Sequence, residues 1–193
     1  MPSADWVFPQ IFLNPVDHKY GKIDYASGQL RVAQSVGNCK LKAGAILNVK
    51  EPFRSVKTCI HTCMENGDWH NDFHNYTMLW LPDSIKFFVD GNEYCSVDEG
   101  EGLYAVQANG RDLPSKDSLK TLGDSLLAPF DKDFYITLGY GVGGIYEFDD
   151  NSRKPWRNDD ARSLNKFWRN AKKYDWTDDK YKFEIDYIRV YAV

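Results

Sequence analysis

The sequence predicts an all-β fold, either a sandwich or a barrel, in a chain of 193 residues. Aromatic residues make up 15% of the chain, and many lie in short segments such as 85–89 and 134–138. This composition suits a pleated, half-buried surface better than a helix. Similar segments recur with turn residues between them, as the strands of sandwiches and barrels do. A chain of this length can bury one sizeable core, so we expect a single domain over 1–193.

Nine segments have the composition of strands. They are 6–13, 29–34, 45–49, 58–64, 74–81, 84–89, 93–97, 134–140 and 181–191. Asp90-Gly91, between two of them, predicts a type I′ hairpin turn, because both central residues of that turn need a positive φ. Apolar and polar residues largely alternate from Phe183 to Tyr191. We therefore expect the last segment to be a strand with one buried face that closes a sheet.

One segment has the pattern of a helix. The stretch 159–174 opens with acidic residues and ends near two lysines, which suits the helix dipole at both ends. Its apolar residues follow a 3.6-residue spacing: Leu164, Phe167, Trp168 and Ala171. The polar stretch 98–127 and the charged stretch 149–160 have little periodicity, so we expect loops there.

The charge pattern argues against a nucleic-acid partner. The formal net charge is −4 and the isoelectric point is about 5.6, and the basic residues form no stripe that could follow a phosphate backbone. No run of apolar residues approaches the ~20 needed to cross a bilayer, so we expect no membrane span. The first six residues lack the basic and apolar regions of a signal peptide, so a secretion signal would lie outside this sequence.

The even number of cysteines predicts two disulfides and an oxidising compartment rather than free thiols. The four are Cys39, Cys59, Cys63 and Cys95, which allow three pairings. His61 lies between Cys59 and Cys63, but this spacing is unlike the paired C-x2-C knuckles of structural zinc sites. We expect no metal there.

The segment 27–38, SGQLRVAQSVGN, resembles the active-site strand of glycoside hydrolase family 16, which reads S-G-E-I-D-I-M-E-S-R-G-N. In that family the first Glu is the nucleophile, the Asp supports it and the last Glu is the acid/base. By position these residues fall on Gln29, Arg31 and Gln34. Residues i and i+2 of a strand share a face, and a bulge before i+5 returns the third side chain to that face.

The resemblance implies a vestigial site without catalytic residues. Retaining hydrolysis needs two carboxyl groups about 5 to 5.5 Å apart, one ionised and one protonated. The amides of Gln29 and Gln34 have neither the charge nor the labile proton, and Arg31 replaces an acceptor with a cation. Without the flanking resemblance, these three polar residues would be read as the solvent face of a strand.

The resemblance continues through most of the chain, over 5–15, 72–91, 129–144 and 154–168. These stretches are similar to the β-1,3-glucan recognition proteins, also called Gram-negative bacteria binding proteins. The resemblance implies a concanavalin-like jelly-roll β-sandwich with a concave glucan cleft, secretion into hemolymph and a role in sensing microbial walls. It also implies that the N-terminal strands of the sandwich are missing, which would leave the strand 6–13 as an exposed edge prone to self-association.

Aromatic side chains commonly grip sugars, because the apolar face of a pyranose stacks on a ring while polar groups bind its hydroxyls. The candidates for stacking are Phe12, Trp156, Trp6 and Trp69. Gln29 and Gln34 are the candidates for polar contacts. For three other aromatic residues the pattern favours the core: Trp80, Phe87 and Trp168.

The remaining chemically active residues point to no cofactor. His61, His70 and His74 have no convincing nucleophile or metal cluster beside them in the sequence, so surface or hydrogen-bonded roles are expected. Asp186 matches an acidic position that holds structural calcium in some family members, but its N-terminal partner ligands are absent.

Two functions from different classes fit this pattern. The first is a non-catalytic β-1,3-glucan-binding pattern-recognition protein, derived from a retaining β-1,3-glucanase, that acts in invertebrate innate immunity. The second is an interaction domain that docks components of an immune serine-protease cascade and has no sugar affinity. The Gln-Arg-Gln strand is compatible with both. A glucanase with relocated carboxylates is a third and weaker reading.

Overall fold

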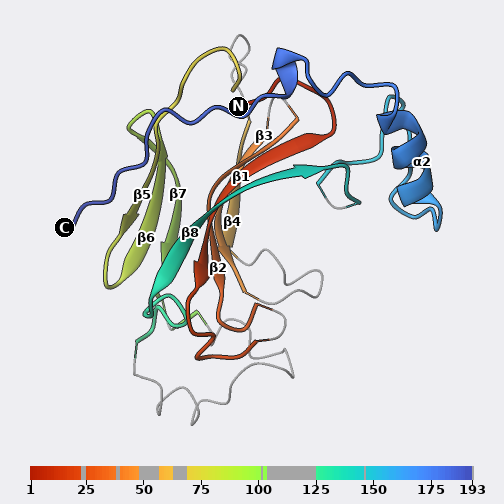
Figure 1. The fold of residues 1–193 in the computed structure, drawn as a ribbon. Coiled ribbons are helices and arrows are strands. Elements are labelled where there is room, and N and C mark those ends of the chain that lie inside the picture. The colour runs from red at the N-terminus through yellow and green to blue at the C-terminus, as the bar shows by residue number, and fades with distance from the viewer. Residues whose placement is uncertain are drawn as a thin grey trace.

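The computed structural model describes residues 1–22, 25–37, 40–47, 57–62, 69–100, 102–103, 125–145 and 147–192. Within these residues the regular structure is almost entirely strand, arranged in two antiparallel sheets (Figure 1). The predicted all-β class is confirmed. No helix in this part of the chain is long and apolar enough to span a membrane.

The larger sheet has five described strands in the order β4-β3-β2-β1-β8. Their bounds are β1 Val7–Pro15, β2 Gln29–Val36, β3 Lys40–Ile46, β4 Lys57–Thr62 and β8 Phe134–Val142. β1 pairs with β2 on one side and with β8 along its whole length on the other. The expectation that the strand 6–13 would be an unpaired edge is therefore wrong, because β8 returns from far along the chain to cover it.

The smaller sheet, within the same residues, has three strands in the order β5-β6-β7. Their bounds are β5 Tyr76–Trp80, β6 Ser84–Val89 and β7 Asn92–Asp98. Asp90 and Gly91 join β6 to β7 with φ values of 49° and 81°, as the predicted hairpin turn requires. The Cys59–Cys95 disulfide connects β4 of the larger sheet to β7 of the smaller one. Cys39 and Cys63 lie outside the described residues, so the second disulfide stays a prediction.

The main core lies between the two sheets. The larger sheet contributes Leu30, Ala43 and Ala45. The smaller sheet contributes Ile85, Phe87, Cys95 and Val97. Phe87 is fully buried, as predicted, and Trp80 packs at the margin of the core, where its indole Nε1 donates to the carbonyl of Phe130 at 3.1 Å.

Two strand predictions need correction. β3 begins at Lys40, not at the apolar run 45–49, of which the structure describes only 45–47. Along its first residues, the lysines at 40 and 42 are half-buried while Leu41 and Ala43 are fully buried. β3 is therefore an alternating strand. Its lysines interrupt the apolar run, so a search for continuous apolar residues does not detect its first half.

The C-terminal prediction is wrong for a different reason. A 3₁₀ turn, η3 (Asp179–Tyr181), is followed by irregular backbone over 182–192 (Figure 1). This segment is almost entirely exposed, and no described strand pairs with it. Alternation makes a strand possible, but a strand also needs a neighbour for its backbone N–H and C=O groups.

The predicted helix is present but shorter. α2 spans Ser163–Ala171, and it buries only Ala171 fully. Phe167 packs against Trp156, with ring centroids 5.2 Å apart. Trp168 is 61% exposed, so the expectation that it belongs to the core is wrong. The loop expected over 149–160 is irregular in the structure, and most of 98–127 lies outside the described residues.

Candidate saccharide-binding face

The strand register brings Gln29, Arg31 and Gln34, which the sequence resemblance aligns with catalytic positions, to one face of the larger sheet. On β3, the residues Ile46, Gly44 and Lys42 alternate and therefore share a face. Their partners on β2 are, in the same order, Gln29, Arg31 and Gln34. The register shifts between Arg31 and Gln34, which is the bulge that the sequence predicts. After the vestigial site that the resemblance implies, we call this side of the sheet the vestigial face.

At one end of the vestigial face a ladder of amide hydrogen bonds crosses three strands. Gln29 Nε2 on β2 donates to Asn14 Oδ1 on β1 at 2.7 Å. Asn14 Nδ2 in turn donates to Thr137 Oγ1 on β8, also at 2.7 Å. The side chain of Gln29 is buried, so the ladder fixes its orientation. We call Gln29, Asn14 and Thr137 the ladder end.

The other end of the face is crowded with basic groups. The guanidinium carbon of Arg31 lies 5.5 Å from the ring centroid of Phe12, which is buried beneath it. Gln34 is only 1% exposed, and its Oε1 has no hydrogen-bond partner within the described ranges. Burial, and then the positive charge of Arg31, lower the pKa of Lys42. We call Arg31, Gln34 and Lys42 the charged end.

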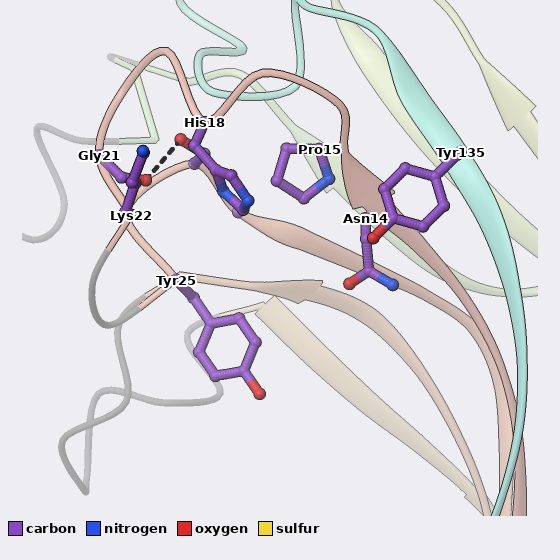
Figure 2. Close-up of a pocket in the computed structure, with 9 residues that line it drawn as sticks. Asn14, Pro15, His18, Gly21, Lys22, Tyr25 and Tyr135 are labelled. Atoms are coloured by element: carbon purple, nitrogen blue, oxygen red, sulfur yellow. Dashed lines mark hydrogen bonds between the residues drawn. The ribbon is translucent and has the colours of Figure 1, made fainter.

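A pocket of about 280 Å³ opens beside the ladder end (Figure 2). Its lining residues are Asn14, Pro15, His18, Gly21, Lys22, Tyr25, Ser27, Gly28 and Tyr135. Figure 2 shows Tyr25 and Tyr135 on opposite sides of the pocket, with Asn14 beside Tyr135. The two tyrosines are 40% and 54% exposed. Their rings and hydroxyls are available to a ligand, as the side chains of sugar-binding sites are.

The loop that forms this pocket is held by local hydrogen bonds. Ser27 Oγ donates to the carbonyl of Gly21 at 2.8 Å and accepts from the backbone N–H of Tyr20 at 3.1 Å. The Tyr20 hydroxyl donates to the Asp131 carboxylate at 2.8 Å. A Cβ at Gly28 would lie 2.5 Å from the ring of Phe130, so only glycine fits there. The pocket wall is therefore set by packing as well as by the loop.

The sequence did not identify Tyr25 and Tyr135 as candidates. Tyr25 has an isolated place in a loop, where a single aromatic residue carries no periodic signal. Tyr135 reaches the site only because β8 pairs with β1, which places it opposite Asn14. The position of Tyr25 could have marked it as a candidate, because it lies three residues before Gly28 and close to the start of β2.

The aromatic residues that the sequence proposed for sugar stacking are buried in this structure. Trp156 is 2% exposed and packs edge-to-face on Trp6, with ring centroids 5.2 Å apart. Phe148 completes this cluster, and the indole Nε1 of Trp156 donates to the carbonyl of Gly144 at 3.0 Å. Trp69 is buried in a separate cluster. None of these rings, nor that of Phe12, presents its face to solvent here, so their contact with sugar stays a prediction.

Two of the histidines that the sequence considered, His61 and His74, have packing and hydrogen-bonding partners. His74 Nδ1 is 2.6 Å from Asp90 Oδ2, so it is hydrogen-bonded as expected. The ring of His61 packs between Trp69 and Tyr94 at centroid distances of 5.4 and 5.5 Å. Among the described residues, no three His, Cys, Asp or Glu side chains form a group that could hold a metal ion. Asp186, the calcium candidate, lies in the exposed C-terminal segment.

Sequence comparison relates the whole chain to glucan-binding proteins. It is 39% identical over 199 residues to beta-1,3-glucan-binding protein 2 of Manduca sexta and 40% identical over 201 residues to Gram-negative bacteria-binding protein 3 of Drosophila melanogaster. Both alignments cover 100% of this chain but only 40% of the relative. The chain thus spans less than half the length of these relatives. Residues 55–109 match the family model of glycosyl hydrolases family 16.

Comparison with solved structures identifies the fold. The endo-beta-1,3-glucanase of Pyrococcus furiosus superposes with a TM-score of 0.54 at 21% identity, over 80% of this chain and 52% of that one. The laminarinase catalytic domain of Thermotoga maritima gives a TM-score of 0.54 at 18% identity, over 79% and 54%. The two sheets are therefore part of a jelly-roll sandwich. The chain is a relative of the β-1,3-glucan-binding and Gram-negative bacteria-binding proteins and is built on the fold of glycoside hydrolase family 16.

Proposed function

We propose that this chain is a non-catalytic β-1,3-glucan-binding domain that serves pattern recognition in innate immunity. One observation carries the proposal. The positions of the three catalytic carboxylates share a face beside a pocket walled by two exposed tyrosines, but they hold Gln29, Arg31 and Gln34. These residues support sugar binding without cleavage, because amides supply neither the charge nor the proton that retaining hydrolysis needs. The names of the relatives support the ligand.

We further propose that the chain acts as one domain of a secreted protein. The Cys59–Cys95 disulfide supports secretion, because disulfides persist mainly in oxidising compartments. A polysaccharide of microbial walls would meet the protein outside the cell. Docking of immune serine proteases is the alternative role, and no contact among the described residues favours it.

Binding is tested by pull-down of the purified chain on insoluble β-1,3-glucan, with insoluble xylan as the control polysaccharide. We expect retention on the glucan only. Tyr25→Ala and Tyr135→Ala should each weaken binding about tenfold, by removing a stacking or hydrogen-bonding surface of about 1.5 kcal/mol. Tyr191→Ala is the matched control, because Tyr191 is an exposed tyrosine in the C-terminal segment. Absence of glucan binding would favour the interaction domain.

Catalysis is tested separately with soluble laminarin. We expect no release of reducing ends above background, because neither amide can act as nucleophile or as acid. Release that disappears in the Gln34→Ala variant would contradict the non-catalytic assignment. Retention on glucan together with such release would mean that the chain is an enzyme with relocated groups.

A further inference from the structure

The helix α2 presents two large apolar side chains to solvent. Leu164 is 77% exposed and Trp168 is 61% exposed. They are four residues apart within Ser163–Ala171, so they lie on one stripe of the helix. Another side of α2 packs on the domain, where Phe167 contacts Trp156. Figure 1 shows α2 at one end of the molecule, away from the smaller sheet. The exposed stripe is therefore not needed to hold the helix in place.

Basic groups lie directly beside this stripe. Arg169 is in the last turn of α2, Lys172 and Lys173 follow it, and all three are exposed. The Nζ atom of Lys172 lies 5.8 Å from the ring centroid of Trp168. The range 157–173 contains six basic and two acidic residues, whereas the formal net charge of the chain is −4. Positive charge is thus concentrated at one end of an acidic chain. We give the name α2 patch to Leu164, Trp168, Arg169, Lys172 and Lys173.

The acidic residues around α2 do not neutralise the patch. Four of them pair with other basic residues: Asp159 with Arg157, Asp160 with Lys166, Asp178 with Lys180 and Asp179 with Lys182. Asp175 accepts a hydrogen bond from Thr177 Oγ1 at 2.6 Å. Among the described residues, no carboxylate forms an ion pair with Arg169, Lys172 or Lys173. The patch therefore keeps its positive charge.

The combination of apolar and basic groups indicates the chemistry of a partner. The helix dipole accounts for cations at the end of α2, but not for the exposed Leu164 and Trp168 beside them. A convex helix surface offers no groove for an extended peptide. A helix at a membrane interface instead buries its apolar stripe at the edge of the acyl chains, while its Lys and Arg residues bind the phosphates of the headgroups. Tryptophan suits this layer, since its ring is apolar and its indole N–H is polar.

We propose that the α2 patch docks the protein on the surface of an anionic phospholipid bilayer. Leu164 and Trp168 enter the interface, and Arg169, Lys172 and Lys173 contact lipid phosphates. Such peripheral docking needs no membrane-spanning segment. The inference goes beyond the proposed function, because no residue of the vestigial face or of its pocket belongs to the patch. A chain that binds saccharide and lipid through separate surfaces would bind more tightly to a surface that offers both.

The experiment measures co-sedimentation of the full chain with phospholipid vesicles at about 0.15 M salt, where long-range attraction is screened. One set of vesicles is pure phosphatidylcholine, and the other contains about 25% phosphatidylglycerol as the anionic lipid. We expect binding to the anionic vesicles to be at least about tenfold tighter. General attraction does not predict this preference, since the net charge of the chain is negative.

Variants locate the contact. Leu164→Ala and Trp168→Ala should each weaken binding to anionic vesicles about tenfold, and alanine keeps the helix formed. Arg169→Gln and Lys173→Gln should each weaken it about fivefold. A thermal melt confirms that each variant is folded. The matched controls are Phe73→Ala, at a ring that is 70% exposed before β5, and Lys86→Gln, at a lysine of β6 that pairs with Glu93 at 3.5 Å. Neither should change vesicle binding.

The outcomes separate this inference from the proposed function. Retention on glucan without binding of anionic vesicles overturns the inference and leaves glucan binding intact. Binding of anionic vesicles without retention on glucan supports the inference and removes the proposed ligand. Equal affinity for the two kinds of vesicle overturns the inference, and so does vesicle binding that survives Leu164→Ala and Trp168→Ala. If a poly-glutamate peptide binds as tightly as the anionic vesicles, the partner is an acidic protein and the inference is overturned.

Discussion

The two ends of the vestigial face differ in how their polar groups are satisfied. At the ladder end, Gln29, Asn14 and Thr137 form consecutive hydrogen bonds across three strands, next to an open pocket. At the charged end, Gln34 has an acceptor without a described partner, and Lys42 lies beside Arg31. The amide of Gln29 thus belongs to a hydrogen-bonded network, whereas Lys42 and Arg31 place two like charges in half-buried positions.

This contrast teaches that polar groups on one face of a sheet can differ in their effect on stability. A hydrogen-bonded amide such as Gln29 stabilises the sheet and holds a pocket residue in place. A buried acceptor without a described partner, such as Gln34 Oε1, instead lowers stability, and so do two neighbouring like charges. The contrast predicts that substitutions at the two ends have opposite effects on the free energy of unfolding.

The largest effect is expected where the ladder end meets the pocket wall. Gly28→Ala places a Cβ 2.5 Å from the buried ring of Phe130 at a φ of +73°. Overpacking and the left-handed backbone together should lower the free energy of unfolding by about 2 to 5 kcal/mol. Urea denaturation measures this loss.

Gly37→Ala provides the control for backbone strain. Gly37 has a φ of +57°, but a Cβ there would have no atom within 4 Å. Its cost should be limited to about 1 to 2 kcal/mol of left-handed strain. Equal losses at the two glycines would show that the contact with Phe130 does not constrain the pocket wall.

Leucine in place of each glutamine is expected to change the free energy of unfolding in opposite directions. Gln29→Leu removes a donor and leaves Asn14 Oδ1 without its partner, so the free energy of unfolding should fall by about 1 kcal/mol. Gln34→Leu removes a buried acceptor that has no described partner, so the free energy of unfolding should rise by about 1 kcal/mol.

Both glutamine variants are measured by urea denaturation under the same conditions, each against the parent chain. The two side chains are buried and belong to the same strand, so each variant is the control for the other. A loss of stability in both would mean that the Gln34 amide is as well satisfied as the Gln29 amide. The contrast between the two ends would then disappear.

The shared face of Gln29, Arg31 and Gln34 could be predicted because the resemblance marks the three positions and their directions depend on local geometry. Alternation along one strand and a single bulge determine the direction of all three side chains. The Asp90-Gly91 hairpin is local in the same sense, since two residues set the turn. Patterns of this kind need no knowledge of distant segments.

The predictions that failed depended on partners far along the chain, because β8 covers the strand 6–13 that was expected to be an open edge. The burial of Trp6 and Trp156 also had no signal in the sequence, since these rings pack on each other and on Phe148, and their contact with sugar stays a prediction. The sequence alone does not distinguish an aromatic residue that packs on another aromatic residue from one that stacks on a ligand. The pocket likewise needed the pairing of β1 with β8, which no short pattern encodes.

The smallest effect concerns the pH dependence of the charged end. Burial and Arg31 lower the pKa of Lys42 in the folded state below its value of 10.5 in the unfolded chain. Between these two pKa values the unfolded state binds more protons, so the contribution of Lys42 to stability becomes more favourable as pH rises. Below the folded-state pKa both states are protonated, and the full penalty of the buried charge is present.

Lys42→Met should therefore be stabilising at pH 7, and its advantage over the parent chain should shrink as pH approaches 10.5. Thermal unfolding of both proteins at a series of pH values measures the difference, with Lys86→Met as the control for loss of a strand lysine. An advantage for Lys42→Met that does not change with pH would mean that Lys42 is not desolvated beside Arg31, and the electrostatic half of the contrast would be lost.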